Sequence, residues 1–337
     1  MSPHSSSHVP LSVLDLVPVS EGMSFAEAMT ASMDTAIAAD RAGFARYWFA
    51  EHHNTPAIAS SATAVLIDRA AALTERIRVG SGGIMLPNHS PLSVIEQFGT
   101  LAQLHGDRID LGLGRAPGTD PITAQFLART SAEPQSFLDA VALMRSWSSS
   151  LPDSGMRVSA PVAEGTEVPM WVLGSTVNGA QLAATLGMPF SVASHFAPEQ
   201  HRQALDVYRQ AFDADAATAQ IDAPHTMVGV NVVVADTDSE AEHLFTTMQQ
   251  TFIGILTGQR GPTPPPRDLG EIASAAVIDR ANAQLSVRAI GSPTTVVHQL
   301  EQIVADTGAD ELIVAGAVFD PVARVRSLEL LAEAWLG

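Results

Sequence analysis

Short, almost continuously apolar runs recur along this chain and alternate with segments of helical periodicity. Parallel strands that are covered on both faces have this character, whereas half-exposed strands alternate apolar and polar residues. The pattern therefore predicts an α/β fold with a parallel sheet and helices packed against it. We expect strands at 11–17, 46–50, 77–86, 108–114, 169–174, 189–194, 226–235 and 310–316.

Eight strands that alternate with helices fit a (β/α)8 TIM barrel, which typically needs about 250 residues. Helical periodicity is clearest at 25–44 and 91–106. The remaining length would lie in insertions between strands 4 and 5 (115–168) and between strands 7 and 8. An open doubly wound sheet is the competing architecture, but no G-x-G-x-x-G motif follows the first predicted strand.

The domain organisation is expected to be simple. We predict a disordered tail at 1–10 and a single barrel domain over 11–337. The start of the chain, "MSPHSSSHVP", has neither a basic region nor an apolar stretch and does not read as a signal peptide.

The later stretch "TGQRGPTPPPRD" (257–268) is rich in proline and glycine, which disfavour helix and sheet. It predicts a mobile lid over 257–288.

Charge and cysteine content narrow the classes of partner. The chain has 18 basic and 36 acidic residues, scattered along its length, so nucleic acid is not an expected partner. Apolar runs are too short to span a bilayer, so no membrane association is expected. The lack of cysteine excludes disulfides and thiolate chemistry and fits a cytoplasmic protein.

Residues directly after the predicted strands are the candidates for a site, because TIM-barrel active sites lie at the C-terminal ends of the strands. Polar, titratable and glycine-rich residues collect there. They are Glu51, His52 and His53, "PNHSP" (87–91), "RAPGTD" (115–120), "GSTVNG" (174–179), and Ser194 with His195.

The stretch "LGSTVNGAQLAATLG" (173–187) is the clearest ligand signal. A strand ends at Gly174, and Ser175 and Thr176 precede a helix. Free N–H groups, hydroxyls and the helix dipole together favour a bound phosphate, although ordinary helix capping explains this segment alone equally well. Arg115, after the neighbouring strand, could complete an anion site through a charge-assisted hydrogen bond.

Three glycines, Gly80, Gly82 and Gly83, lie inside the third predicted strand. Glycine weakens a strand, so this cluster indicates either a bulge or the close approach of a flat ligand. Close packing inside the barrel is the alternative.

The two adjacent histidines point to opposite sides if they extend a strand, so one of them is expected to face the site. No Asp-x-His or His-x-His follows the first strand, and a metal site is therefore disfavoured. A single imidazole suits proton transfer. A structural histidine bonded to Glu51 is the alternative.

Four segments together carry a resemblance to a known family. They are "AGFARYWFAEHHN" (42–54), "IRVGSGGIMLPNHSPLSVIEQFGTLAQLHGDRIDLGLGRAPGTD" (77–120), "VLGSTVNGAQLAATLGMPFSVASHF" (172–196) and "AIGSPTTVVHQLEQIVADTGADELIVAG" (289–316). In this order they resemble the bacterial luciferase-like flavin monooxygenase family, over nearly all of residues 11–337. The chain is most similar to single-chain members of unassigned substrate. Gly174 replaces a carboxylate and Gly114 a reactive cysteine of the light-emitting catalytic subunit.

The resemblance implies a TIM barrel that binds FMN, with reduced FMN supplied by a separate NAD(P)H-dependent flavin reductase. O2 would form a peroxyflavin that oxygenates a small organic substrate, and a homodimer is expected. His52 would assist proton transfer and Glu51 would orient it. Gly82–Gly83 would pass the flavin ring with a cis peptide bond. The predicted cofactor-binding residues are Gly82, Gly83, Arg115, Gly174, Ser175, Thr176, Asn178 and Ser194, and no metal ligand is predicted.

Two other functions stay open at this point. Some relatives with this fold use the deazaflavin F420 for hydride transfer, which would make the protein a dehydrogenase or reductase. The third possibility is a non-catalytic flavin-binding or partner subunit. The presence of His52 argues against that last possibility, because a carrier has no need of a proton donor.

Overall fold

Nine parallel strands form one continuous sheet in the computed structural model, which describes residues 8–116, 118–127, 133–150 and 157–337. Eight of them close into a barrel in the order β1-β2-β3-β4-β5-β6-β7-β9, because β6 pairs with β7 and β9 pairs with both β7 and β1. The strands are β1 (Leu11–Asp15), β2 (Arg46–Phe49), β3 (Arg78–Met85), β4 (Ile109–Gly114), β5 (Met170–Gly174), β6 (Phe190–Val192), β7 (Thr226–Val234), β8 (Arg288–Gly291) and β9 (Glu311–Ala315).

The closed barrel confirms the predicted (β/α)8 fold and excludes the open sheet. All eight predicted strands are present. The sequence prediction missed β8, which lies in the insertion between β7 and β9 and pairs with Asn231–Val234 of β7, outside the barrel. Its four residues alternate between partly buried and buried positions, so they lack the long apolar run that marks the other strands.

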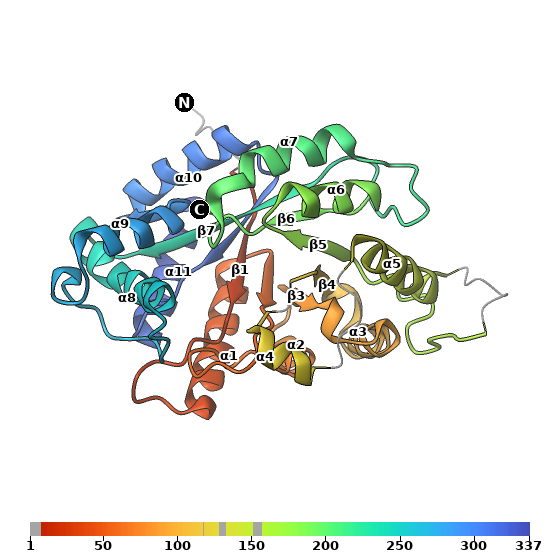
Figure 1. The fold of residues 1–337 in the computed structure, drawn as a ribbon, viewed down its shortest axis with the longest axis horizontal. Helices are drawn as coiled ribbons and strands as arrows, with labels where there is room; N and C mark the ends of the chain where they lie inside the picture. The colour runs from red at the N-terminus through yellow and green to blue at the C-terminus, as the bar shows by residue number, and fades with distance from the viewer. Residues whose placement is uncertain (1–7, 117, 128–132, 151–156) are drawn as a thin grey trace.

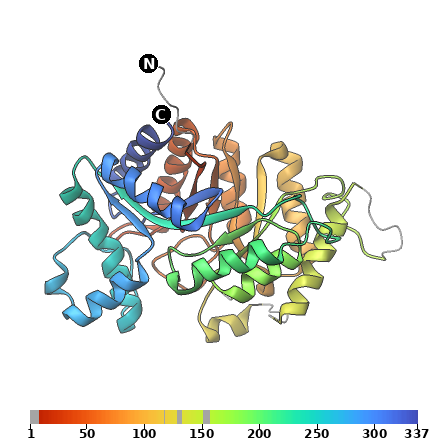
Figure 2. The same ribbon diagram turned by 90° about the horizontal axis from the view of Figure 1, so that it is seen from above.

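Helices surround the strands on the outside of the barrel (Figures 1 and 2). The α-helices are α1 (Phe25–Ala42), α2 (Thr63–Leu73), α3 (Pro91–His105), α4 (Pro121–Phe126), α5 (Pro134–Ser148), α6 (Val177–Thr185), α7 (His201–Ala211), α8 (Asp238–Thr257), α9 (Ala275–Gln284), α10 (Pro293–Thr307) and α11 (Pro321–Trp335). Local sequence sets their ends. In α1, Ser24 and Glu27 form a capping box, and Gly43 ends the helix in the left-handed conformation.

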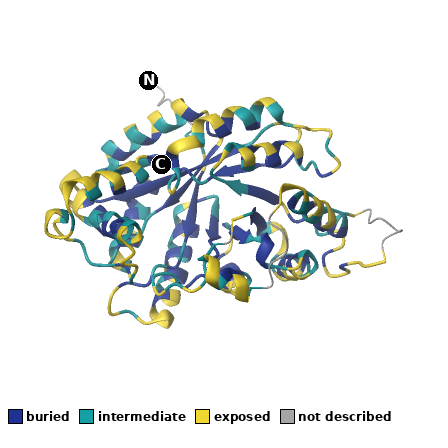
Figure 3. Ribbon diagram, viewed as in Figure 1, coloured by how far each residue is buried: buried dark blue, intermediate teal, exposed yellow. Residues whose placement is uncertain are grey.

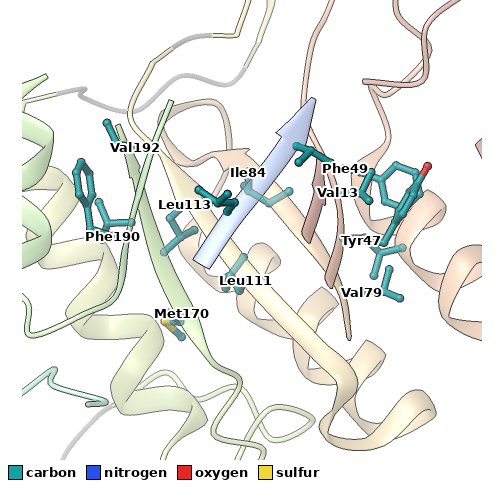
Figure 4. Packing of buried hydrophobic residues seen from close by; sticks show 14 of the residues in the cluster. Val13, Tyr47, Phe49, Val79, Ile84, Leu111, Leu113, Met170, Phe190 and Val192 are labelled. Carbon is teal, nitrogen blue, oxygen red and sulfur yellow. The ribbon is translucent and has the colours of Figure 1, made fainter. Parts of the chain in front are cut away.

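The main apolar core lies between the barrel and its helices. Alternate strand residues such as Val13, Phe49, Leu111 and Phe190 point outward into it (Figure 4). The strands are therefore buried on both faces, whereas the outer sides of the helices are exposed (Figure 3). Among the described residues no helix is both long and apolar enough to cross a bilayer.

The inward-facing residues form two layers of different character. Near the N-terminal ends of the strands, the Arg46 guanidinium donates to Asp110 Oδ2 at 2.6 Å and to Glu311 Oε1 at 3.1 Å. Ser12 also donates to Glu311, and Arg78 Nη2 donates to Asp110 Oδ1 at 2.6 Å. Above this charged layer the interior is apolar, with Leu14, Trp48, Ala50, Trp171, Met227, Ile313 and Ala315.

The structure refines the predicted tail and lid. Residues 1–7 of the tail lie outside the described residues, but His8 stacks on Trp335 with ring centroids 3.9 Å apart, so the packed chain begins before the predicted boundary at Leu11. The predicted lid contains helix α9. Its proline-rich part is bonded to the loop after β1: Thr263 N–H donates to Val19 O at 2.7 Å, and Glu21 N–H donates to Thr263 O at 2.9 Å. The mobility of this segment stays a prediction.

Removing the charge of Arg46 should destabilise the barrel. Arg46→Met keeps much of the aliphatic stem but leaves two buried carboxylates short of a partner, and we expect the free energy of unfolding to fall by about 3 kcal/mol. Arg202→Met is the matched control, since Arg202 and Asp306 form an exposed pair and should contribute less than about 1 kcal/mol. Urea unfolding measures both. Equal effects of the two variants would show that the charged layer does not stabilise the fold.

Candidate active site

The third strand carries a bulge at the predicted glycines. The β3–β4 register shifts between Ser81 and Ile84, and the Gly82–Gly83 peptide bond is cis, as the family resemblance implied. A Cβ atom on Gly82 would lie 2.6 Å from Leu14 Cδ1, and one on Gly83 would lie 2.7 Å from the Gly112 carbonyl oxygen. A side chain at Gly83 would therefore meet fixed backbone, whereas one at Gly82 would require the Leu14 side chain to move.

Gly80 has a different reason to be glycine. A Cβ atom there would lie 2.4 Å from the Asp110 carbonyl oxygen and 2.9 Å from Trp48 Nε1, inside the barrel. Of the two interpretations of the glycine cluster, close packing explains Gly80. The bulge lies at Gly82 and Gly83.

Glu51 is the centre of a buried hydrogen-bond cluster after β2. Its carboxylate accepts from His53 Nε2 at 2.8 Å, from His89 Nε2 at 2.9 Å and from the Met85 N–H at 2.9 Å. Burial by itself raises the pKa of Glu51, but the hydrogen bonds and positive charge from His89, with further bonds from His53 and Met85, bring it below its ordinary value. The carboxylate is thus held ionised.

This geometry bears on the predicted role of Glu51. No hydrogen bond described in the structure joins the Glu51 and His52 side chains, although the Glu51 charge acts on the His52 imidazole, and the orienting role of Glu51 stays a prediction. The structural histidine bonded to Glu51 is His53, and His89 is a second one. Sequence reasoning did not assign His89 a role; the only signal was its place in "PNHSP" after the third strand.

Ligand atoms of Glu51, His53 and His89 lie within 4.8 Å of one another, which is close enough to hold a metal ion. The distances between them are those of hydrogen bonds. Each imidazole nitrogen that faces the carboxylate would have to give up its proton before it could bind a cation. The observed arrangement is therefore a hydrogen-bond cluster that connects β2 to the segment after β3.

The loop after β2 is also fixed to the loop after β4. His53 N–H donates to Gly118 O at 3.3 Å, and the Thr119 hydroxyl donates to His53 O at 3.1 Å. Gly118 has φ +61°, and a Cβ atom on it would lie 2.8 Å from the Glu51 carbonyl oxygen. Only glycine fits there without strain, and the two loops therefore hold each other in place.

His52 differs from its neighbours because its side chain is not used in this cluster. Its backbone N–H donates to Ser60 O at 3.2 Å, but its Nδ1 is buried and has no hydrogen-bond partner. Burial lowers the pKa of His52, against the opposing effect of the Glu51 charge. The imidazole is therefore mostly neutral near pH 7 and has a nitrogen available for a proton.

The predicted anion site lies at the ends of β4 and β5. Gly114 pairs with Leu173 in the register, so Arg115 follows β4 beside Gly174, directly before Ser175. Thr176 is the N-cap of α6, and its hydroxyl accepts from the Gly179 N–H at 3.3 Å. Thr176 therefore caps α6, as one of the two interpretations of this segment predicts.

Polar residues at the start of α6 remain accessible to solvent although the helix is capped. Asn178, in the first turn of α6, and Thr176 are exposed, and Ser175 and Arg115 are partly exposed. Gly174 has a packing role, because a Cβ atom on it would lie 3.3 Å from Gly179 Cα. Its contact with a cofactor stays a prediction.

Ser194 has a structural partner. Its hydroxyl is buried and donates to the Gly229 carbonyl oxygen at 2.7 Å, which ties the end of β6 to β7. The hydroxyl oxygen can still accept a hydrogen bond, and the cofactor contact of Ser194 stays a prediction.

The next residue, His195, was noticed in the sequence but given no role. Its Nδ1 is buried without a hydrogen-bond partner and lies 2.2 Å from where a Cβ atom of Gly229 would be. Burial lowers the pKa of His195 to about 4. No local pattern in the sequence could reveal this, because the contact is with a different strand.

Comparison with known proteins places the chain in a family. The profile of the luciferase-like monooxygenases matches residues 10–311. The chain belongs to this family. A luciferase-like monooxygenase of Escherichia coli K12 is 44% identical over 324 residues, covering 96% of each chain. The solved structure of apo-MsnO8 is 34% identical, has a TM-score of 0.85 and covers 98% of this chain and 99% of its own.

Two more distant structures share the fold alone. The oxygenating constituent of 3,6-diketocamphane monooxygenase from Pseudomonas putida, solved with FMN, is 19% identical with a TM-score of 0.71, over 97% of each chain. An F420-dependent secondary alcohol dehydrogenase with an F420-acetone adduct is 14% identical with a TM-score of 0.71, over 97% of this chain and 99% of its own. The family thus supports an oxidoreductase of the monooxygenase type, with both cofactors found on its fold.

The low pKa of His195 predicts a dependence of stability on pH. The unfolded imidazole takes up a proton near pH 6.5, but the folded one does so only near pH 4. Stability should therefore fall as the pH drops through this window, by at most about 2 kcal/mol between pH 7 and pH 5. In His195→Gln this part of the pH dependence should disappear, as measured by urea unfolding at both pH values.

His243→Gln, at an exposed position of α8, is the control and should retain the wild-type difference between the two pH values. A His195→Gln protein with the full wild-type pH dependence would contradict the burial of a neutral imidazole.

Proposed function

We propose that the protein is a flavin-dependent monooxygenase that uses reduced FMN and O2 to oxygenate a small organic substrate. One observation carries the proposal. Arg115 and the exposed start of α6 lie at neighbouring strand ends, on the same rim as the buried, unpartnered imidazole of His52. This arrangement supports an anion site and a proton-transfer group at one end of one barrel.

The phosphate of FMN fits the end of β5. The positive end of the α6 dipole and the partly exposed Ser175 hydroxyl would bind an anion at that end, and the Arg115 guanidinium would add a full positive charge. Thr176 keeps the helix start in place through its cap. In a protein with twice as many acidic as basic residues, such a local positive site is needed to hold an anionic cofactor.

The flavin ring fits the bulge of β3. Gly82 and Gly83 present backbone without side chains, which suits the flat face of a ring system. The bulge is two strand spacings from the end of β5, roughly 10 Å. A ribityl chain can bridge that span across β4.

Reduced flavin, when bound, supplies two electrons and activates O2 so that one oxygen atom enters the substrate and the other leaves as water. The protein's own part is proton management and exclusion of water. His52 Nδ1 has no protein partner and can accept or return a proton, and the cluster around Glu51 fixes the neighbouring backbone. The apolar layer beneath, with Leu14 and Trp48, closes the barrel to water from below.

F420-dependent hydride transfer is the second candidate, because a dehydrogenase of the same fold holds an F420 adduct. F420 also carries a flat ring and a phosphate, so the same glycines and Arg115 would serve it. Equilibrium titration with FMN and with F420, followed by oxygen uptake in the presence of reduced FMN, distinguishes the two. The supply of reduced FMN by a separate NAD(P)H-dependent reductase and a homodimeric state belong to the proposal through the family resemblance.

Loss of Arg115 should weaken cofactor binding. In Arg115→Ala the phosphate loses a charge-assisted hydrogen bond, and we expect the Kd for FMN to rise by about 10- to 100-fold. Quenching of flavin fluorescence on titration measures the Kd. Arg202→Ala, at an exposed position on α7, should leave it unchanged. An unchanged Kd in Arg115→Ala would remove the anion site from the proposal.

Loss of His52 should impair turnover without loss of cofactor. In His52→Ala we expect FMN affinity to stay within twofold of wild type and substrate-dependent oxygen uptake to fall by about 10²- to 10⁴-fold. Screening of aldehydes, sulfides and ketones with a supplied reductase identifies the substrate for the assay. Wild-type rates in His52→Ala would show that this imidazole has no part in the reaction.

A further inference from the structure

The cluster around Glu51 brings three groups that can bind a metal ion to one point. His53 Nε2 lies 2.8 Å and His89 Nε2 lies 2.9 Å from the same atom, Glu51 Oε1. All three ligand atoms lie within 4.8 Å of one another. The sequence disfavours a metal because no Asp-x-His or His-x-His follows the first strand. The structure supplies the third ligand from another place, since His89 comes from the segment after β3.

Each of the three ligands is held in position by the backbone around it. The His53 N–H is bonded to the loop after β4, and the His89 N–H donates to Leu86 O at 3.0 Å. Glu51 Oε2 accepts from the Met85 N–H at 2.9 Å. Outer hydrogen bonds of this kind orient metal ligands. Ligand atoms about 2.1 Å from a tetrahedral ion are about 3.4 Å apart, so each imidazole would withdraw from the carboxylate by only about half an ångström.

The protons of the cluster are no barrier to an ion. In the hydrogen-bonded arrangement each Nε2 donates its proton to the carboxylate, but a neutral imidazole can carry that proton on Nδ1 instead. Metal-bound imidazoles have this form, with the second ring nitrogen protonated. The Glu51 side chain is 1% exposed, whereas those of His53 and His89 are 17% and 34% exposed. The cluster is thus reached from solvent through its histidines.

The ligand set selects the class of ion. Two imidazoles and one carboxylate suit Zn²⁺ and its neighbours Co²⁺ and Ni²⁺, whereas Mg²⁺ and Ca²⁺ prefer oxygen ligands alone. Three protein ligands leave the fourth tetrahedral position for a water molecule. We propose that Glu51, His53 and His89 bind one Zn²⁺ ion, which links the segments after β2 and β3. This inference does not rest on the proposed flavin function.

The test is calorimetric titration of EDTA-treated, dialysed protein with ZnCl2. We expect wild type to bind one Zn²⁺ per chain, and His53→Gln and His89→Gln to bind it about 100-fold or more weakly, because each lacks one ligand. Glutamine keeps an N–H donor for the Glu51 carboxylate. His105→Gln is the matched control, since His105 is bonded to Asp68 at 2.8 Å in a pair that has no third ligand, and its affinity should equal that of wild type. Titration with MgCl2 should give no binding.

The outcomes decide the site without reference to turnover. Absence of Zn²⁺ binding in wild type, or an unchanged affinity in both His53→Gln and His89→Gln, would overturn the proposal. Binding of Mg²⁺ as tight as that of Zn²⁺ would exclude imidazole ligands and overturn it as well. Far-UV circular dichroism establishes that each variant is folded. If the variants do not fold, X-ray absorption at the zinc edge of the wild-type complex decides, because fewer than two imidazoles around the ion would contradict the site. Titration of the same protein with FMN tests the proposed function separately.

Discussion

The paired charges inside the barrel are the interaction on which the rest of the structure depends. Arg46 from β2 reaches Asp110 on β4 and Glu311 on β9, so one guanidinium crosses the interior and connects three strands. Burial alone lowers the pKa of Arg46, but the two carboxylates raise it above its ordinary value. Buried charges are stable only when they are paired, so the barrel must close to bring these strands together.

That closure makes the two ends of the barrel different. At the N-terminal end of the strands, Arg46, Arg78, Ser12, Asp110 and Glu311 bond to one another. At the C-terminal end the Glu51 cluster fixes the loops after β2, β3 and β4, while His52 and His195 keep ring nitrogens without partners. The same end carries the bulge of β3 and the start of α6. Rigid support and unused chemical groups lie side by side there, as a preorganised site requires.

Contacts between distant parts of the chain determine the hydrogen bonds and burial of several residues that the sequence had suggested for the site. Ser194 follows a strand and has a hydroxyl, which made it a plausible cofactor ligand, but Gly229 on another strand takes its hydrogen bond. Glu51 is adjacent to His52 in sequence yet bonds to His53 and to the distant His89. His195 gave no signal beyond its position, because its burial depends on a glycine 34 residues further along the chain.

The sequence by itself determined the barrel, the order of its strands and the rim on which polar residues collect, because periodicity, capping and strand-end position are local properties. The glycines of the third strand indicated a bulge or a flat ligand, and the family resemblance singled out Gly82 and Gly83. The sequence also placed Arg115 next to the start of α6, since parallel neighbours in a barrel end at the same side. Only the tertiary structure decided which side chains are already bonded and which are free. Hydrogen-bond partners in a barrel come from strands that are far apart in the chain, and burial depends on all of them at once.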